Sequence, residues 1–170
     1  MVGDSSLSSV LRALTCLELY SNSDFYLNHP IFNSLLESNT ELFSSKEAVL
    51  SFFLSNETYE NDLNSFHNYI KEEAQNMCKN RQWASHICIM ALSTVINCTI
   101  SVSYPDFGYP HYKAALSQVF EPRQNYQSGA KCCNEIKIIF CNSISSFPFV
   151  ANHFVPLLKR KKNESVSTAK

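Results

Sequence analysis

The order of sequence patterns predicts an α+β fold, in which helices pack on one small β-sheet. Two observations support this class. Apolar residues recur at helical spacing through residues 7–96, whereas alternating, β-branched segments appear only from residue 99 onward. Helices followed by strands are typical of α+β proteins, while regular alternation of the two would instead indicate a parallel α/β sheet.

The first predicted helix carries aliphatic residues at helical spacing, with three polar residues before it that can cap its start. The aliphatic residues are Leu7, Val10, Leu11, Leu14 and Leu17, and the candidate caps are Asp4, Ser5 and Ser6. Pro30 suits the first position of a second helix over residues 30–36. Ser44 and Glu47 have the spacing of a capping box for a third helix that ends near Leu54.

Two further helices are expected before the strands. The first is amphipathic, with an apolar face of Leu63, Phe66, Ile70, Ala74 and Met77. Its solvent side is expected to hold Glu60, Lys71, Glu72 and Glu73. The second covers residues 83–96, begins at Trp83 and is apolar enough to be mostly buried, so Trp83 is expected in the core.

Three strands are predicted in the last part of the chain. Residues 99–104 alternate and end at Pro105, residues 135–141 (EIKIIFC) form the second, and residues 153–158 (HFVPLL) the third. Pro156 places the third strand at a sheet edge. Residues 105–128 are expected to be a loop with a short apolar patch at 114–120. The domain is therefore predicted over residues 1–158, followed by a basic, disordered tail over 159–170 that begins KRKK.

Composition excludes several classes of protein. A formal net charge of -1 argues against broad electrostatic binding of nucleic acid, and no apolar run is long enough to span a bilayer. The N-terminus lacks the features of a signal peptide, and seven Cys without a CxxC pair indicate a reduced, intracellular protein, cytoplasmic or nuclear. Two groups, Cys132-Cys133 with Cys141 and Cys78 with His86 and Cys88, lack zinc-site spacing, so neither metal nor cofactor is expected.

The helix that begins at Trp83 and leads into a strand resembles the ovarian-tumour (OTU) family of cysteine proteases. The matching residues are Trp83, Ile87, Ile89, Ala91, Leu92 and Ser93, then Thr99-Ile100-Ser101-Val102. Within that family the chain is most similar to the vertnin-like branch. This narrower resemblance rests on Leu11-Arg12-Ala13-Leu14-Thr15, Phe25-Tyr26 and Tyr104-Pro105. Taken without the resemblance, the same stretch is a core helix followed by a core strand.

The resemblance implies a papain-type fold in which His153, followed by the aromatic Phe154, occupies the catalytic His position. In such a site the imidazole takes the thiol proton, and the thiolate attacks a carbonyl. Taken alone, a His beside apolar residues is more often structural. The third catalytic residue often lies two positions after the His, where this chain has Val155. Asn152 is adjacent, and adjacent strand residues point to opposite faces, so no partner for His153 is identified.

The nucleophile that the resemblance implies is a Cys at the start of a helix, and no such Cys is expected here. Gly3-Asp4-Ser5-Ser6-Leu7 can be aligned to that motif with Ser6 at the Cys position. The alternative, which we prefer, aligns Gly3-Asp4 and Leu11-Arg12 with the loop and helix after the nucleophile helix, so that the nucleophile segment is missing. Cys16 is mid-helix. A missing helix would leave one sheet face partly uncovered at Ile100, Val102, Ile136 and Ile138.

Two functions therefore remain open at this point. The first is an OTU-like, deubiquitinase-type cysteine-protease domain that is truncated or degenerate and inactive as given, with ubiquitin or a ubiquitin-like protein as the implied partner. The second is a non-enzymatic protein-binding module of a nuclear or transposon-derived vertnin-like protein. Whether the chain is an enzyme depends on a nucleophilic Cys that the sequence does not identify.

Overall fold

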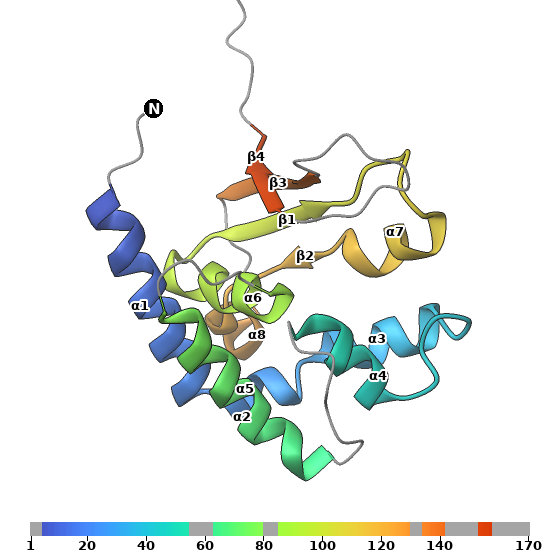
Figure 1. Ribbon diagram of the computed structural model, residues 1–170, viewed down its shortest axis with the longest axis horizontal. Coiled ribbons are helices and arrows are strands. Elements are labelled where there is room, and N and C mark those ends of the chain that lie inside the picture. Colours follow the sequence, from blue (N-terminus) through green and yellow to red (C-terminus); the bar gives the residue numbers. More distant parts are fainter. Residues whose placement is uncertain (1–4, 55–62, 80–84, 130–133, 142–152, 158–170) are drawn as a thin grey trace, which may run out of the picture.

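The computed structural model describes residues 5–54, 63–79, 85–129, 134–141 and 153–157, which place helices against one side of a four-stranded sheet (Figure 1). The helices within these ranges are α1 (Ser5–Ser21), α2 (Ser23–Leu27), α3 (Pro30–Ser38), α4 (Lys46–Phe53), α5 (Leu63–Met77), α6 (His86–Val95), α7 (Pro110–Leu116) and α8 (Arg123–Ser128). The strands are β1 (Thr99–Ser103), β2 (Val119–Phe120), β3 (Glu135–Cys141) and β4 (His153–Pro156). The α+β class is as predicted.

The sheet has the strand order β2-β1-β3-β4. Its two central strands, β1 and β3, are parallel, with Ile100 opposite Ile136 and Val102 opposite Ile138. The edge strands β2 and β4 each run antiparallel to their neighbours. The edge position predicted for β4 is confirmed by this strand order. An edge suits Pro156, because proline lacks an N–H and cannot donate to a further strand.

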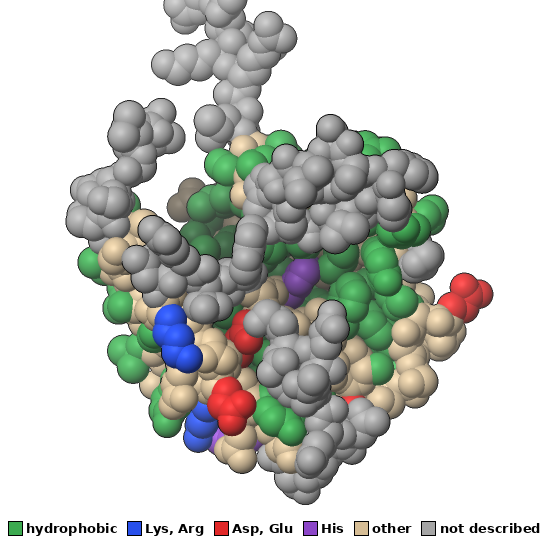
Figure 2. All heavy atoms as spheres, viewed as in Figure 1, with side chains coloured by type: hydrophobic (Ala, Val, Ile, Leu, Met, Phe, Trp, Pro, Cys, Tyr) green, Lys and Arg blue, Asp and Glu red, His purple; other side chains and the backbone are tan. Residues whose placement is uncertain are grey.

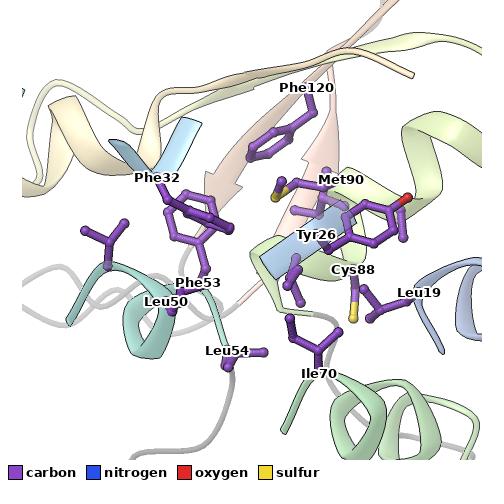
Figure 3. Packing of buried hydrophobic residues seen from close by; sticks show 14 of the residues in the cluster. Leu19, Tyr26, Phe32, Leu50, Phe53, Leu54, Ile70, Cys88, Met90 and Phe120 are labelled. Atoms are coloured by element: carbon purple, nitrogen blue, oxygen red, sulfur yellow. The ribbon is translucent and has the colours of Figure 1, made fainter. Parts of the chain in front are cut away.

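Helix α6 lies at the centre of the core and packs against β1, while α1 packs against both α5 and α6. Eight of the ten α6 residues are buried, as expected for the most apolar helix of the chain. Figure 3 shows how side chains from several helices and β2 converge around it, including Leu19, Tyr26, Phe53, Ile70 and Phe120. The core is therefore built on the helical side of the sheet.

Helix α1 forms where the sequence predicts it, but its aliphatic stripe does not face the core. Among residues 7–21 of this helix, whose burial is described, the buried ones are Thr15, Cys16 and Leu19. The predicted apolar face is instead exposed at Leu7, Val10, Leu14 and Leu17. The spacing predicts the helix itself correctly. It did not identify the buried face, because the helix is apolar on two sides and only packing against α5 and α6 selects one of them.

Three helix details differ from the sequence prediction. Ser45, and not Ser44, is the N-cap of α4, and its Oγ accepts from the backbone N–H of Ala48 at 3.3 Å. Glu73 is buried although it was placed on the solvent side of α5, since it lies three residues after Ile70 and borders the apolar face. Helix α6 begins at His86, whereas Trp83 lies outside the described residues, so its predicted burial stays a prediction.

Residues 105–128 are more ordered than the loop that the sequence predicted. They form α7, β2 and α8, with Pro110 in the first turn of α7 and Gly129 ending α8 in the left-handed conformation at φ 68°. The expectation of an uncovered sheet face is wrong for Ile100 and Val102, which are buried, because α6 covers β1. Only Ile136, near the start of β3, is substantially exposed among the four residues named for that face.

Candidate active site

His153 lies at the start of β4, beside β3, which is the strand position that the sequence predicted. The antiparallel register places it directly opposite Cys141, the last residue of β3. The orientation and exposure of the imidazole lie outside what the structure describes. Its catalytic role therefore stays a prediction, and only the backbone position is established.

Cys141 is a residue that sequence reasoning did not connect with His153. The antiparallel register pairs the backbone of Cys141, at the end of β3, with that of His153, at the start of β4. Cys141 is half-buried, and its Sγ is 3.9 Å from the carbonyl oxygen of Ile139. Because Cys141 lies on a strand, no helix N-terminus is available from its own element to stabilise a thiolate.

The helix N-terminus that adjoins β4 is that of α6. The ring of Phe154 on β4 lies 6.1 Å from the ring of His86, the first residue of α6. A thiol at a helix N-terminus close to a His-bearing strand would combine the two groups that a cysteine protease needs, whichever helix supplies it. The side chains at this junction therefore decide what chemistry the site can perform.

The first turn of α6 carries a cysteine, Cys88, which corrects the expectation that no Cys lies at a helix N-terminus. The sequence signal that indicates this position is Ser85, a residue type favoured at helix starts. As the N-cap of α6, Ser85 makes the helix begin at His86 and not at Trp83, so Cys88 lies in its first turn. Ser85 Oγ is 3.4 Å from Cys88 Sγ, which in turn is 3.9 Å from Glu73 Oε1. Burial, followed by the nearby Glu73 carboxylate, raises the pKa of the Cys88 thiol to about 12. The thiol therefore remains protonated at neutral pH.

Aromatic rings fill the space between the start of α6 and β4. The ring of His86 lies 5.0 Å from that of Phe140 and 5.2 Å from that of Phe53, with Phe52 and Phe154 also around it. Burial lowers the pKa of His86 to about 4, and its Nε2 is buried without a hydrogen-bond partner in the described structure. A neutral imidazole enclosed by rings contributes to the core rather than to proton transfer.

The other described cysteines have no catalytic environment either. Cys16 and Cys98 are buried, and burial is also the main cause that raises the pKa of Cys16 to about 12. Cys78 is exposed just after α5. Cys132 and Cys133 lie outside the described residues. Within the described ranges no three His, Cys, Asp or Glu side chains cluster as a metal site, and no helix there is long and apolar enough to cross a bilayer.

Comparison with known proteins defines the class of this domain. A family model described as "Vertnin, OTU domain" matches residues 1–140, which include every described element except the last residue of β3 and all of β4. The α+β fold with α6 leading directly into β1 agrees with an OTU-type domain. The chain belongs to the vertnin OTU-domain family. No curated protein and no solved structure matches it.

Proposed function

We propose that this chain is a degenerate OTU-type cysteine-protease domain that keeps the fold but does not hydrolyse ubiquitin-type substrates. Family membership supports the protease-like ancestry of the fold, in which a Cys thiolate activated by His would form an acyl-enzyme. The observation that carries the proposal is the state of Cys88. It lies in the first turn of α6, whose first residue His86 contacts Phe154 of β4, yet it is buried and held as a thiol.

The residues that remain from the ancestral site are assigned within the same proposal. His153 on β4 occupies the catalytic His position, and the domain extends over residues 1–158 with 159–170 as a tail. The partner class is ubiquitin or a ubiquitin-like protein, as an OTU-type domain implies. Cys141, opposite His153, is the remaining described thiol next to that position, and it lacks a helix N-terminus.

A ubiquitin carrying a C-terminal electrophile tests the proposal directly. The expected result on incubation with the full chain is no covalent adduct, because a reactive thiolate must lie within hydrogen-bond reach of the His. A parallel titration of isotope-labelled ubiquitin with the same chain reports binding that does not require catalysis. Perturbation of the ubiquitin tail without adduct formation would support a domain that binds but does not cleave.

Two matched variants make the outcome interpretable. Cys78→Ser removes an exposed thiol away from β4 and controls for non-specific alkylation. An adduct that persists in Cys78→Ser but disappears in Cys141→Ser or His153→Ala would identify an active Cys141–His153 pair. That result would overturn the proposal of inactivity.

A further inference from the structure

Helix α1 presents an apolar stripe to solvent that the described part of the chain leaves uncovered. The exposed fractions are 57% for Leu7, 54% for Val10, 45% for Leu14 and 62% for Leu17. The opposite side of the same helix, with Thr15, Cys16 and Leu19, packs into the core. A helix that is apolar on two sides is expected to be covered on both. In Figure 2, hydrophobic side chains lie along the edge of the molecule where Figure 1 places α1.

The spacing of the stripe is that of a coiled-coil seam. Positions 7, 10, 14 and 17 are separated by three, four and three residues, which is the a/d spacing of two heptads. At 100° per residue, the four side chains lie within an arc of about 80° around the helix axis. The series also reads identically in both directions about position 12. An antiparallel second copy therefore sets Leu7 against Leu17 and Val10 against Leu14, and the two-fold axis repeats both contacts.

The charges on α1 do not oppose such self-pairing. The helix contains two charged residues, and both contact other elements of the same chain. Arg12 Nη1 donates to the carbonyl oxygen of Met77 at 3.0 Å, and Glu18 Oε1 accepts from Arg123 Nε at 2.8 Å. The two-fold axis would otherwise bring like charges together, a common obstacle to symmetric association.

A depression beside the C-terminal half of the stripe has room for a side chain of the second copy. It has a volume of about 260 Å³ and is lined by Leu14, Leu17, Glu18, Ser21, Asn22 and Val95. In the antiparallel register this end of α1 faces the start of the other α1, where Leu7 protrudes. The fit of a projecting Leu beside a Leu-lined hollow is the knobs-into-holes arrangement of paired helices.

We infer that two copies of this chain associate through an antiparallel α1–α1 pair centred on position 12. The four side chains present on the order of 300 Å² of apolar surface, the size of the largest patch on an ordinary monomer. That is less than the roughly 800 Å² per partner of a standard interface, so the association is expected to be weak and reversible. The inference is independent of the proposed function.

Sedimentation equilibrium of the full chain, from low to high micromolar concentration, measures the association. The expected result is a rise from monomer to dimer mass, and Leu14→Glu is expected to weaken the association about tenfold or more, because a charge would be buried at the seam. Phe107→Glu, which changes a residue 73% exposed and remote from α1, is the matched control and should leave it unchanged. Circular dichroism of each variant confirms that the monomer still folds.

A charge-pair experiment tests the direction of pairing. In the antiparallel register Leu7→Glu with Leu17→Lys is self-complementary, whereas Leu7→Glu with Leu17→Glu is self-repelling. The first double variant should dimerise more tightly than the second, and the difference should shrink as salt screens the charges. A wild-type chain that stays monomeric, a dimer insensitive to Leu14→Glu, or equal behaviour of the two double variants would each overturn the inference.

Discussion

Burial determines the acid–base behaviour of two cysteines and two histidines in the described part of the chain. Burial disfavours the charged form, so it raises the pKa of the Cys16 and Cys88 thiols to about 12 and lowers the pKa of His29 and His86 to about 4. At neutral pH all four side chains are therefore uncharged. Cys88 and His86 belong to residue types that can carry chemistry, but their surroundings assign them to the core.

Thiol reactivity should separate the described cysteines into two groups. Cys78 is exposed and should be alkylated rapidly by a small electrophile under native conditions, whereas Cys16 and Cys88 should react only when the chain unfolds. Pulsed alkylation followed by peptide mass spectrometry measures each site separately. Native labelling of Cys88 as fast as that of Cys78 would show that the first turn of α6 is accessible, contrary to its described burial.

His86 should make the folded state sensitive to acid. Its pKa is lowered from 6.5 to about 4 in the fold, so below pH 6.5 the unfolded chain binds a proton that the folded chain does not. Stability is therefore lost as pH falls through this window, and the loss is complete near pH 4. For one such group the loss from about pH 7 to pH 5 is on the order of 2 kcal/mol.

The measurement is denaturant unfolding at both pH values for the wild type and for His86→Phe, which keeps an aromatic ring among Phe53 and Phe140. The variant should lose less stability on acidification. His29, whose pKa is also lowered to about 4 by burial, remains in the variant and should retain part of the acid sensitivity. An unchanged pH dependence in His86→Phe would contradict the burial of this imidazole.

Individual helices show how local signals fix an element while neighbours fix its orientation. Pro30 begins α3 and Ser45 caps α4 through local backbone geometry, so their positions follow from a few adjacent residues. The exposed stripe of α1 has no such local cause. Its direction follows from the packing of Cys16 and Leu19 against other helices.

The cap of α4 gives a prediction with a matched neighbour. Ser45→Ala removes the acceptor for the Ala48 N–H and should lower the free energy of unfolding by about 1 kcal/mol. Ser44→Ala changes an exposed serine one residue earlier and should alter it by less than about 0.5 kcal/mol. Chemical denaturation of both variants distinguishes them. Equal losses, or a larger loss for Ser44→Ala, would favour the capping box first expected from the sequence.

At the scale of the whole molecule, one polar network joins helices that are far apart in the chain. Glu18 on α1 accepts from Arg123 on α8, at 2.8 Å from Nε and 3.3 Å from Nη2, and from the hydroxyl of Tyr26 on α2 at 3.0 Å. The backbone N–H of Arg123 donates to Thr94 Oγ1 on α6 at 2.9 Å. Because the Glu18–Arg123 pair is mostly buried, removing one partner leaves a charge with reduced hydration.

A double-mutant cycle measures that coupling. Glu18→Ala and Arg123→Ala should each lower the free energy of unfolding by about 1–3 kcal/mol, and the double variant should lose less than the sum of the two. The Lys113–Asp106 pair offers a control, because both of its side chains are largely exposed and solvent screening should leave its coupling close to zero. Strict additivity for Glu18 and Arg123 would contradict the network.

The sequence by itself determined the α+β class, the positions of β1, β3 and β4, the edge position of β4, the positions of the longer helices and the OTU vertnin-like resemblance. These features depend on local periodicity, on Pro and Ser at helix starts and on contiguous motifs such as Leu11–Thr15. Tertiary structure alone decided which side of α1 is buried, that Glu73 and Cys88 lie in the core, and that Cys141 stands opposite His153. Those outcomes depend on contacts between distant segments, which desolvate a side chain or pair two strands, and no local pattern specifies which segments meet.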